Sequence, residues 1–235
     1  MNVLLEKCLG MLYPQTCCFC GKISKKPLCK NCLSKIEYTS PPYCKKCGKP
    51  IAISEDSLCF DCKHQKRFFE TGRSVWIHQG NVKWSIYQFK YHNRRIHAEF
   101  YANELWRLYG EEILNWNVDV IMPVPLHKKR RRKRGYNQAE VLAEKIGKKM
   151  GVPVDTWSVI RMKNTRPQKI LGSQKRKENL EHAFVIKKLR PDTECVLIVD
   201  DIYTTGNTIN AMAKTLREHG VHKVFFLTIS IGQGF

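Results

Sequence analysis

The stretch from Val196 to Thr208, VLIVDDIYTTGNT, decides the fold of this chain. Its four apolar residues, 196–199, can be buried on both faces, as a central parallel strand requires. Asp200 and Asp201 follow at the point where the strand is expected to leave the sheet. A polar loop then leads into a helix whose apolar residues recur at helical spacing, namely Ile209, Met212, Ala213 and Leu216. This order of strand, loop and helix predicts an α/β fold.

The loop between this strand and helix predicts a site for an anion and a sugar. Free backbone N–H groups and the positive end of the helix dipole point at a phosphate, and Gly206 lets the backbone come close. The two carboxylates repel a phosphate, so they are placed to accept hydrogen bonds from sugar hydroxyls or to lie near a metal. A phosphate on one side and a diol on the other describe a ribose 5-phosphate. An ordinary buried strand with a helix cap is the alternative.

An apolar run, two acidic residues and then Thr-Thr-Gly-x-Thr resemble the 5-phosphoribosyl-1-diphosphate (PRPP) motif of type I phosphoribosyltransferases. The resemblance implies that Asp200 and Asp201 hold the ribose 2- and 3-hydroxyls. It also implies that one short segment wraps the 5-phosphate, made of Thr204, Thr205, Gly206, Asn207 and Thr208.

Length and composition fit a folded protein of one or two domains. The chain has 235 residues, 43% of them hydrophobic, and no apolar run approaches the roughly 18 residues that a membrane span needs. Residues 1–13 lack a basic leader and are interrupted by Glu6 and Lys7, so they make a poor signal peptide. We therefore expect a cytoplasmic protein.

The net charge of +20 is concentrated in one segment. Residues 127–190 carry 20 Lys and Arg against 5 Asp and Glu, and seven of the basic residues are consecutive, from Lys128 to Arg134. Such a field attracts polyanions, either diphosphates or nucleic acid. A solvated basic loop is the alternative reading of the run.

Cysteines define a separate N-terminal region. Ten of the eleven precede residue 63, and Cys-x-x-Cys occurs four times within a unit that repeats. In a cytosolic chain such pairs are reduced or metal-bound, and four thiolates per unit suit one tetrahedral, structural Zn²⁺. The expected ligands are Cys17, Cys20, Cys29 and Cys32 in the first unit and Cys44, Cys47, Cys59 and Cys62 in the second. The repeat favours sequential pairing, and an interleaved arrangement stays open. A redox role is disfavoured because no thioredoxin-like βαβ pattern surrounds the pairs.

The metal region is expected to end near residue 72. Cys18 has the wrong spacing for a ligand, and Cys8 and Cys195 read as ordinary buried thiols. Residues 63–72 are charged and without periodicity, which predicts a linker. The predicted domains are 1–72, a zinc-ribbon domain with its linker, and 73–235, the α/β domain.

The second part of the chain alternates between strand and helix patterns. Strands are expected at 75–78 and 118–122, and helices at 81–89 and 95–109. The segment Pro123-Val124-Pro125-Leu126 forms a stiff loop at the carboxyl end of a strand, where α/β sheets bind ligands. Asn137 is the expected N-cap of a helix with the apolar face Ala139, Leu142, Ala143 and Ile146.

A long polar connection, residues 165–179, separates strand-like segments near 157–161 and 183–186. Long unstructured loops inside compact domains are usually functional, and a basic surface loop is the alternative. The residues that mark it are Thr165, Gln168, Arg176 and Asn179.

Taken in order, these pieces resemble the ComF family of competence proteins over nearly the whole chain. They are the double four-cysteine unit, Pro123-Val124-Pro125, RGYNQ at 134–138, Thr165-x-x-Gln168 and the PRPP motif. The resemblance implies an α/β domain with a type I phosphoribosyltransferase-like parallel sheet flanked by helices, and a small N-terminal double zinc-ribbon domain with four cysteines per metal. It also implies a role in DNA uptake during natural transformation. The chain departs from the family at 128–134, where some apolar or acidic residues are expected and every residue is basic.

The same resemblance gives individual residues expected roles. The loop Val124, Pro125 and Leu126 would bind diphosphate, and residues 165–179 would close over PRPP, which binds with Mg²⁺. Contacts to diphosphate or nucleic acid are expected from Lys128, Lys129, Arg130, Arg132 and Arg134. The implied partners are PRPP, single-stranded DNA and other competence proteins such as a DNA-uptake helicase. No membrane insertion is expected, although the protein could stand at the inner face of the membrane during uptake.

Two functions stay open on the sequence alone. The first is a PRPP-binding module that handles incoming single-stranded DNA, with bases stacked on rings such as Tyr43, Phe68, Tyr136 or Trp157. The second is an active phosphoribosyltransferase of nucleotide metabolism, which displaces diphosphate from C1 of PRPP with a nitrogen nucleophile. Such catalysis needs positioning and charge stabilisation more than a dedicated base. No catalytic residue and no acceptor can be assigned.

Overall fold

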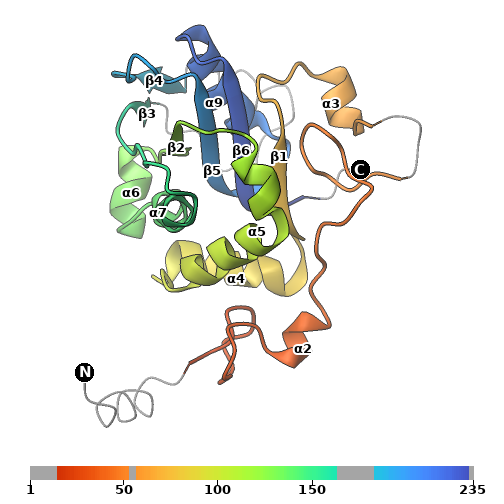
Figure 1. The fold of residues 1–235 in the computed structure, drawn as a ribbon. Helices are drawn as coiled ribbons and strands as arrows, with labels where there is room; N and C mark the ends of the chain where they lie inside the picture. The colour runs from red at the N-terminus through yellow and green to blue at the C-terminus, as the bar shows by residue number, and fades with distance from the viewer. Residues whose placement is uncertain (1–14, 53–56, 163–182, 233–235) are drawn as a thin grey trace.

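The computed structural model describes residues 15–52, 57–162 and 183–232. At its centre is a parallel sheet with the strand order β1-β6-β5-β2 (Figure 1). The strands are β1 (Gly72–Ile77), β2 (Val120–Pro123), β5 (Cys195–Tyr203) and β6 (Lys223–Ile231). Parallel strands that are covered on both faces need continuous apolar runs. The predicted run at 196–199 meets this need, because all four side chains are fully buried in β5.

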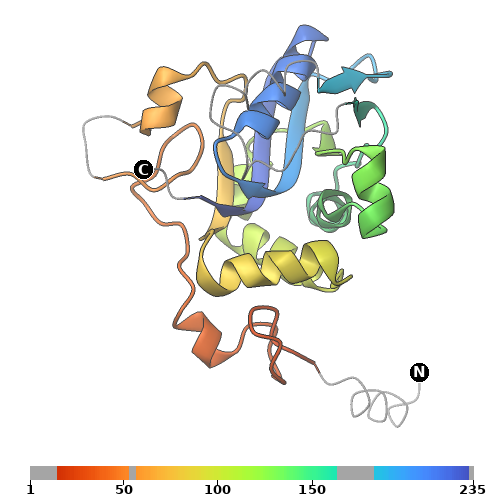
Figure 2. The same cartoon turned by 180° about the vertical axis from the view of Figure 1, so that it is seen from behind.

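Helices cover both faces of the sheet (Figures 1 and 2). The first face carries α4 (Gly80–Tyr91), α5 (His97–Leu114) and α7 (Gln138–Met150), and the second carries α9 (Asn207–Glu218). Successive strand residues point to opposite faces, so Leu197 packs with the first group and Ile198 packs with α9. The apolar faces predicted for α7 and α9 are buried.

Some elements extend beyond their predicted bounds or were not predicted. The helices expected at 81–89 and 95–109 continue to Tyr91 and Leu114. Strand β6 was not predicted; it pairs with both β1 and β5 and so completes the centre of the sheet. Outside this sheet, β3 (Val159–Arg161) and β4 (Phe184–Ile186) pair in antiparallel orientation. The long connection predicted at 165–179 lies outside the described residues.

The two cysteine units pack on opposite faces of the sheet. We call residues 15–36 ribbon one and residues 43–62 ribbon two. Phe19 of ribbon one packs edge-to-face against Trp76 of β1, with the ring centroids 5.2 Å apart. Both residues belong to the hydrophobic core that also contains buried side chains of α4 and α5. The buried cysteines of ribbon two belong to the hydrophobic core on the other face, which contains buried side chains of α9. Each ribbon therefore shares its apolar core with a different side of the α/β domain.

In the part of the chain that the structure describes, no helix combines the length and the apolar character needed to cross a bilayer.

Candidate functional site

The two adjacent carboxylates, Asp200 and Asp201, lie inside β5. The expectation that the strand leaves the sheet before them is wrong, because β5 continues to Tyr203 and stays paired with β6 as far as Ile231. Consecutive strand residues point to opposite faces, so the two acids have different surroundings. The Asp201 residue is 4% exposed, and Asp200 is half-buried, with a larger exposed fraction.

Asp201 is held by side chains from two helices. Its Oδ1 lies 2.8 Å from Nζ of Lys90 at the end of α4, and that ammonium side chain is itself 18% exposed. Its Oδ2 accepts a hydrogen bond of 2.6 Å from Nε2 of Gln138, the first residue of α7. Charge-assisted hydrogen bonds are about twice as strong as neutral ones. The carboxylate is therefore held in one orientation before any ligand binds.

Asp200 is the acid whose charge is disfavoured. Burial, followed by the neighbouring charge of Asp201, raises the pKa of Asp200 to about 7, against the opposing effect of Lys90. Its Oδ1 accepts a hydrogen bond of 2.8 Å from the backbone N–H of Asp201. A carboxylate in this position gains from a ligand that donates hydrogen bonds to it or from a cation.

We expect Asp200→Asn to stabilise the free protein above neutral pH. A carboxyl group whose folded pKa lies above its unfolded value contributes stability at low pH, and that contribution is lost as the pH rises through the folded pKa. With a folded pKa of about 7, ionisation of Asp200 opposes folding at pH 8, and an amide removes the charge. The Tm at pH 8 should rise by roughly a few degrees, and the difference should disappear near pH 4. An equal effect at both pH values would contradict the assigned cause.

The segment 204–208 forms a cradle at the end of β5. Gly206 has φ 76°, in the left-handed region, and a Cβ there would collide with the Tyr203 hydroxyl. It is also the N-cap of α9, with no side-chain cap and no acidic residue in the first turn. The first-turn N–H groups are therefore available to an anion. The Thr205 hydroxyl is buried without a hydrogen-bond partner in the described structure, which fits a phosphate oxygen.

The loop after β2 runs beside the acids. Val124 donates its N–H to Val199 O of β5 at 2.9 Å, and its own carbonyl accepts from Asn137 Nδ2 at 3.0 Å. Asn137 is the N-cap of α7, as predicted, because its side chain accepts from the N–H of Ala139. Val124 and Pro125 are buried and Leu126 is half-buried. The loop is thus fixed between β5 and α7.

The basic run at 128–134 is a short helix, α6 (Lys128–Arg134), and the reading of this run as a loop is wrong. Lys and Arg are good helix formers, and Gly135 ends the helix in the left-handed region at φ 78°. Neighbouring groups bind two of the like charges: Arg131 pairs with Glu140 at 2.6 Å, and Arg134 donates to Gln138 Oε1 at 2.9 Å. Gln138 therefore connects α6 to Asp201.

The eight predicted metal ligands form two separate groups, with the sequential pairing that the repeat favours. They are Cys17, Cys20, Cys29 and Cys32 in ribbon one, and Cys44, Cys47, Cys59 and Cys62 in ribbon two. Sulfur atoms within a group lie within 4.8 Å of one another, and the Sγ pairs Cys20–Cys29 and Cys47–Cys59 are 3.9 and 3.5 Å apart. Zn–S bonds of about 2.3 Å in a tetrahedron require sulfur separations of about 3.8 Å. The donor set therefore fits one structural zinc ion in each ribbon.

Both ribbons use the same turn between their first two ligands. Gly21 and Gly48 have φ 71° and 73°, and each donates its N–H to the carbonyl of the first cysteine at 2.9 Å. Cys18 lies within the turn but belongs to neither group, and burial raises the pKa of its thiol to about 12. Burial likewise raises the pKa of Cys195 to about 11, and this residue is a buried thiol, as predicted. Cys8 lies outside the described residues.

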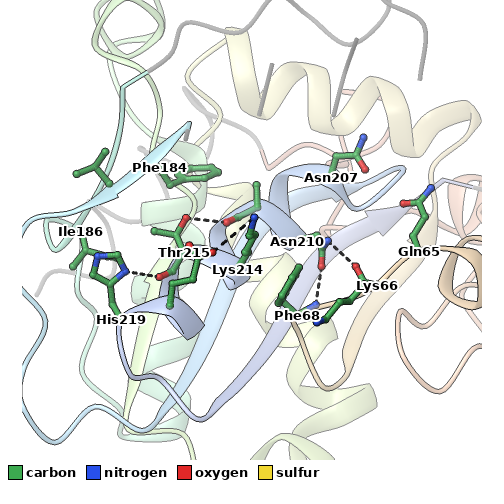
Figure 3. Close-up of a pocket in the computed structure, with 13 residues that line it drawn as sticks. Gln65, Lys66, Phe68, Phe184, Ile186, Asn207, Asn210, Lys214, Thr215 and His219 are labelled. Atoms are coloured by element: carbon green, nitrogen blue, oxygen red, sulfur yellow. Dashed lines mark hydrogen bonds and ion pairs between the residues drawn. The ribbon is translucent and has the colours of Figure 1, made fainter. Parts of the chain in front are cut away.

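The segment expected to be a linker, 63–72, packs against α9 instead. Asn210 of α9 accepts the N–H of Phe68 at 2.8 Å and donates to the carbonyl of Lys66 at 3.1 Å (Figure 3). Phe69 is fully buried against Tyr203, with the rings edge-to-face. The guanidinium nitrogens of Arg67 are buried, and its charge interacts with Cys62 and Tyr203. Sequence polarity indicates a linker, but these contacts tie ribbon two to the phosphate cradle.

A cavity of about 510 Å³ opens between this segment, α9 and β4 (Figure 3). Phe68, Phe184 and Asn210 contribute to its lining. Of residues 200–208, only Asn207 reaches it, so the cavity lies along α9 and not over the acids.

Sequence reasoning missed the side chains that hold Asp201. Gln138 lies in the RGYNQ segment, which the sequence analysis singles out without a role for the glutamine. Lys90 is expected from the sequence only to lie near a phosphate pocket, and its contact with Asp201 has no local signal, because only the packing of α4 on the sheet brings the two together. Of the aromatic rings proposed for base stacking, Tyr136 is buried beneath the Arg95 guanidinium and cannot receive a base, whereas Trp157 is exposed.

Comparisons with known proteins agree with this architecture. The double zinc ribbon domain family matches residues 8–63, and the phosphoribosyl transferase domain family matches residues 98–230. Competence protein F of Haemophilus influenzae is 30% identical over 207 residues, covering 86% of this chain and 89% of that protein. Competence protein ComFC of Bacillus subtilis is 26% identical over 201 residues, covering 82% and 79%. DNA utilization protein YhgH of Escherichia coli is 34% identical over 106 residues, covering 45% and 46%.

Two domain families match in this order, and two relatives align over most of both chains. The two four-cysteine groups and the parallel sheet therefore belong to one known architecture. The chain belongs to the ComF family, in which a double zinc ribbon precedes a phosphoribosyltransferase domain.

Proposed function

We propose that this protein binds PRPP at the end of β5 and handles single-stranded DNA during natural transformation. The observation that carries the PRPP part is the arrangement of Asp200 and Asp201 directly before an uncapped helix N-terminus. The acids accept hydrogen bonds from the ribose 2- and 3-hydroxyls, and residues 204–208 bind the 5-phosphate. The loop 124–126 and residues of 128–134 bind the diphosphate.

Mg²⁺ accompanies PRPP in this proposal. Carboxylate oxygens are ligands that Mg²⁺ prefers, and the raised pKa of Asp200 means that burial and the charge of Asp201 outweigh the groups that stabilise its charge in the free protein. Mg²⁺ supplies charge neutralisation for the diphosphate. The side chains of this chain orient the sugar, and Lys90 holds Asp201 in place through their 2.8 Å ion pair.

The DNA part of the proposal rests on the relatives and on charge. Two relatives are named competence proteins and one is named a DNA utilization protein. The +15 excess at 127–190 suits a polyanion. In the same proposal, the protein acts with a DNA-uptake helicase and stands at the inner face of the membrane during uptake.

We also propose that the chain divides at residue 72 into a zinc-ribbon domain and an α/β domain.

The decisive experiment is a fluorescence anisotropy titration of a labelled single-stranded oligonucleotide at several salt concentrations, with and without PRPP and Mg²⁺. Micromolar or tighter binding that PRPP alters is the expected result. Absence of binding near physiological salt would overturn the DNA part, and PRPP binding measured separately by calorimetry would then stand alone.

The alternative is that PRPP is a substrate for transfer to a nitrogen acceptor. Its support is the phosphoribosyl transferase domain itself, which matches residues 98–230. Release of diphosphate from PRPP in the presence of candidate amines, lost in Asp201→Asn, would favour the enzyme. Binding of PRPP without release would favour the DNA-handling role.

Removing charge from α6 is expected to weaken the dependence of DNA binding on salt. Lys128, Lys129 and Arg132 are exposed on this helix, and each phosphate contact contributes roughly 0.7 to the slope of log K against log salt for single strands. Replacing all three by Gln should therefore reduce the slope by up to about 2. The matched control replaces three exposed lysines elsewhere, Lys187, Lys188 and Lys223. Equal changes in the two variants would show that net charge, and not α6, determines the slope.

A further inference from the structure

Helix α4 carries three aromatic rings on its solvent face. Trp84, Tyr87 and Tyr91 follow the spacing i, i+3, i+7, which places them on one side of a helix. They are 39%, 52% and 49% exposed, and the rings of Tyr87 and Tyr91 lie 5.0 Å apart. The opposite side of α4 is buried, with Val82, Ser85, Ile86 and Phe89. Single exposed apolar residues are ordinary, but three in line on one helix form a surface that needs an explanation. We call these three residues the aromatic stripe.

The chain segments around the aromatic stripe contain no acidic residue. Between Glu70 and Glu99 there is no Asp or Glu, and the same holds between Asp119 and Glu140, the interval that contains α6. Ribbon one, residues 15–36, has five lysines and no acid. The chain as a whole contains 21 Asp and Glu, so these three segments are strongly basic, and the carboxylates that meet them include Glu37 at the N-cap of α4 and Glu140 beside Arg131.

Direct contacts join the three acid-free segments into one surface. At the first end of the aromatic stripe, a Cβ on Gly21 of ribbon one would stand 3.2 Å from the Trp84 ring. At the other end, the Arg134 guanidinium of α6 lies 4.9 Å from the centre of the Tyr91 ring and donates to its hydroxyl at 3.1 Å. Figure 2 shows α4 running between ribbon one below it and the α6 and α7 side of the domain.

We infer that the exposed face of α4 is the single-stranded DNA track of this protein, with bases stacked on the aromatic stripe and phosphates bound by ribbon one and α6. The inference rests on the proposed function and assigns it a surface. Base stacking needs exposed rings beside positive charge. The aromatic stripe provides the rings, and the lysines and arginines of ribbon one and α6 provide the charge. A duplex keeps its bases inside its own stack, so only an unpaired strand can use the rings. With a rise of 1.5 Å per residue, Trp84 to Tyr91 spans about 10 Å, which suits roughly two or three bases.

The track ends at the proposed PRPP site. Arg134 donates to the Tyr91 hydroxyl and to Gln138 Oε1, and Gln138 in turn donates to Asp201. Lys90, the neighbour of Tyr91 in the chain, binds the other oxygen of Asp201. A strand lying on Tyr91 therefore contacts the same hydrogen-bonded chain that orients the acid, and this gives PRPP a physical route by which to alter DNA affinity.

The test measures anisotropy of a labelled oligothymidylate with the full chain and with Tyr87→Leu. Leucine keeps the site apolar but removes the flat ring, so affinity should fall roughly tenfold while the salt slope stays unchanged. Tyr87→Phe should bind as the unaltered protein does. The matched control is Phe60→Leu, which removes a ring that is 69% exposed on ribbon two, and it should leave affinity unchanged. Zinc content and PRPP binding should be unaltered in all three variants.

A second arm replaces the oligothymidylate with an abasic strand of the same length. Without bases there is nothing to stack, so the unaltered protein and Tyr87→Leu should bind this strand equally. If the unaltered protein binds oligothymidylate and Tyr87→Leu binds it equally well, the track is overturned while the proposed function stands. If the unaltered protein binds neither strand, the proposed function itself fails. Tighter binding of duplex than of single strand would also overturn the track.

Discussion

Asp201→Asn is expected to weaken PRPP binding strongly and also to destabilise the protein. Both oxygens of this carboxylate are already engaged, by Lys90 at 2.8 Å and by Gln138 at 2.6 Å. An amide cannot accept at both positions, so one donor loses its partner and the side chain can no longer face the ribose correctly. Each hydrogen bond to a charged group is worth about 1.5–3 kcal/mol, which predicts a loss of PRPP affinity of at least roughly tenfold.

The accompanying loss of stability follows from Lys90. Breaking a buried ion pair by removing one partner costs about 3–5 kcal/mol, because the other charge stays buried. The double variant Lys90→Met with Asp201→Asn should regain most of the unfolding free energy, as measured by urea denaturation, but not PRPP binding, as measured by calorimetry with Mg²⁺. This comparison separates the role of Asp201 in folding from its role in the ligand site. Normal PRPP affinity in Asp201→Asn would overturn the proposed site.

The second large effect is expected from loss of a zinc ligand, and the two ribbons should respond differently. Cys59→Ser and Cys20→Ser are a matched pair, since both residues are half-buried ligands in equivalent groups. Structural zinc contributes about 10–16 kcal/mol in small zinc-binding peptides. Zinc content should fall from two ions to one per chain in each variant, as measured by mass spectrometry of the metal.

Whether PRPP binding or DNA binding is weakened should depend on which ribbon loses its zinc ion. Ribbon two shares its apolar cluster with Tyr203, and Arg67 interacts with both Cys62 and Tyr203. Cys59→Ser should therefore loosen the phosphate cradle and weaken PRPP binding by roughly fivefold or more. Ribbon one contacts α4, where Asn81 Nδ2 lies 3.4 Å from Cys32 Sγ. Cys20→Ser should weaken single-stranded DNA binding and leave PRPP binding intact. Equal effects of both variants on both ligands would contradict this division.

The opposite placement of the ribbons gives the repeat a physical meaning. The two units have the same turn and the same ligand spacing, yet they stabilise different faces of one sheet. In this arrangement one ribbon supports the helix face proposed as the DNA track, and the other supports the helix whose N-terminus is proposed to bind the phosphate.

Much of the candidate site could be predicted from local patterns. The apolar run before Asp200 and Asp201, the glycine at 206 and the spacing of α9 each depend on residues close in the chain. The zinc groups were predictable for the same reason, because ligand spacing within a repeat of four cysteines determines which sulfurs can meet. The capping residue Asn137 likewise acts on a backbone N–H two positions away.

Long-range packing decided the rest. The helix at 128–134 reads as a loop from its charge alone. In the folded protein Arg131 pairs with Glu140, and Arg134 bonds Gln138 and Tyr91, so residues from other elements offset part of the repulsion. The segment at 63–72 reads as a linker because its polarity is local, while the Asn210 contacts that hold it come from α9. Pairing of β5 with β6 keeps both acids inside the strand.

The sequence by itself determined the fold class and the two groups of metal ligands, because each depends on periodicity or on spacing within a short segment. It locates the proposed phosphate site at 204–208 for the same reason. Tertiary structure alone decided which acid is held in place and which has a raised pKa, and which aromatic rings reach solvent. Those properties depend on Lys90, Gln138 and the buried side of α4, which meet Asp201 and the sheet only after the chain has folded. Burial and charge pairing are sums over neighbours from distant segments, and no local pattern encodes them.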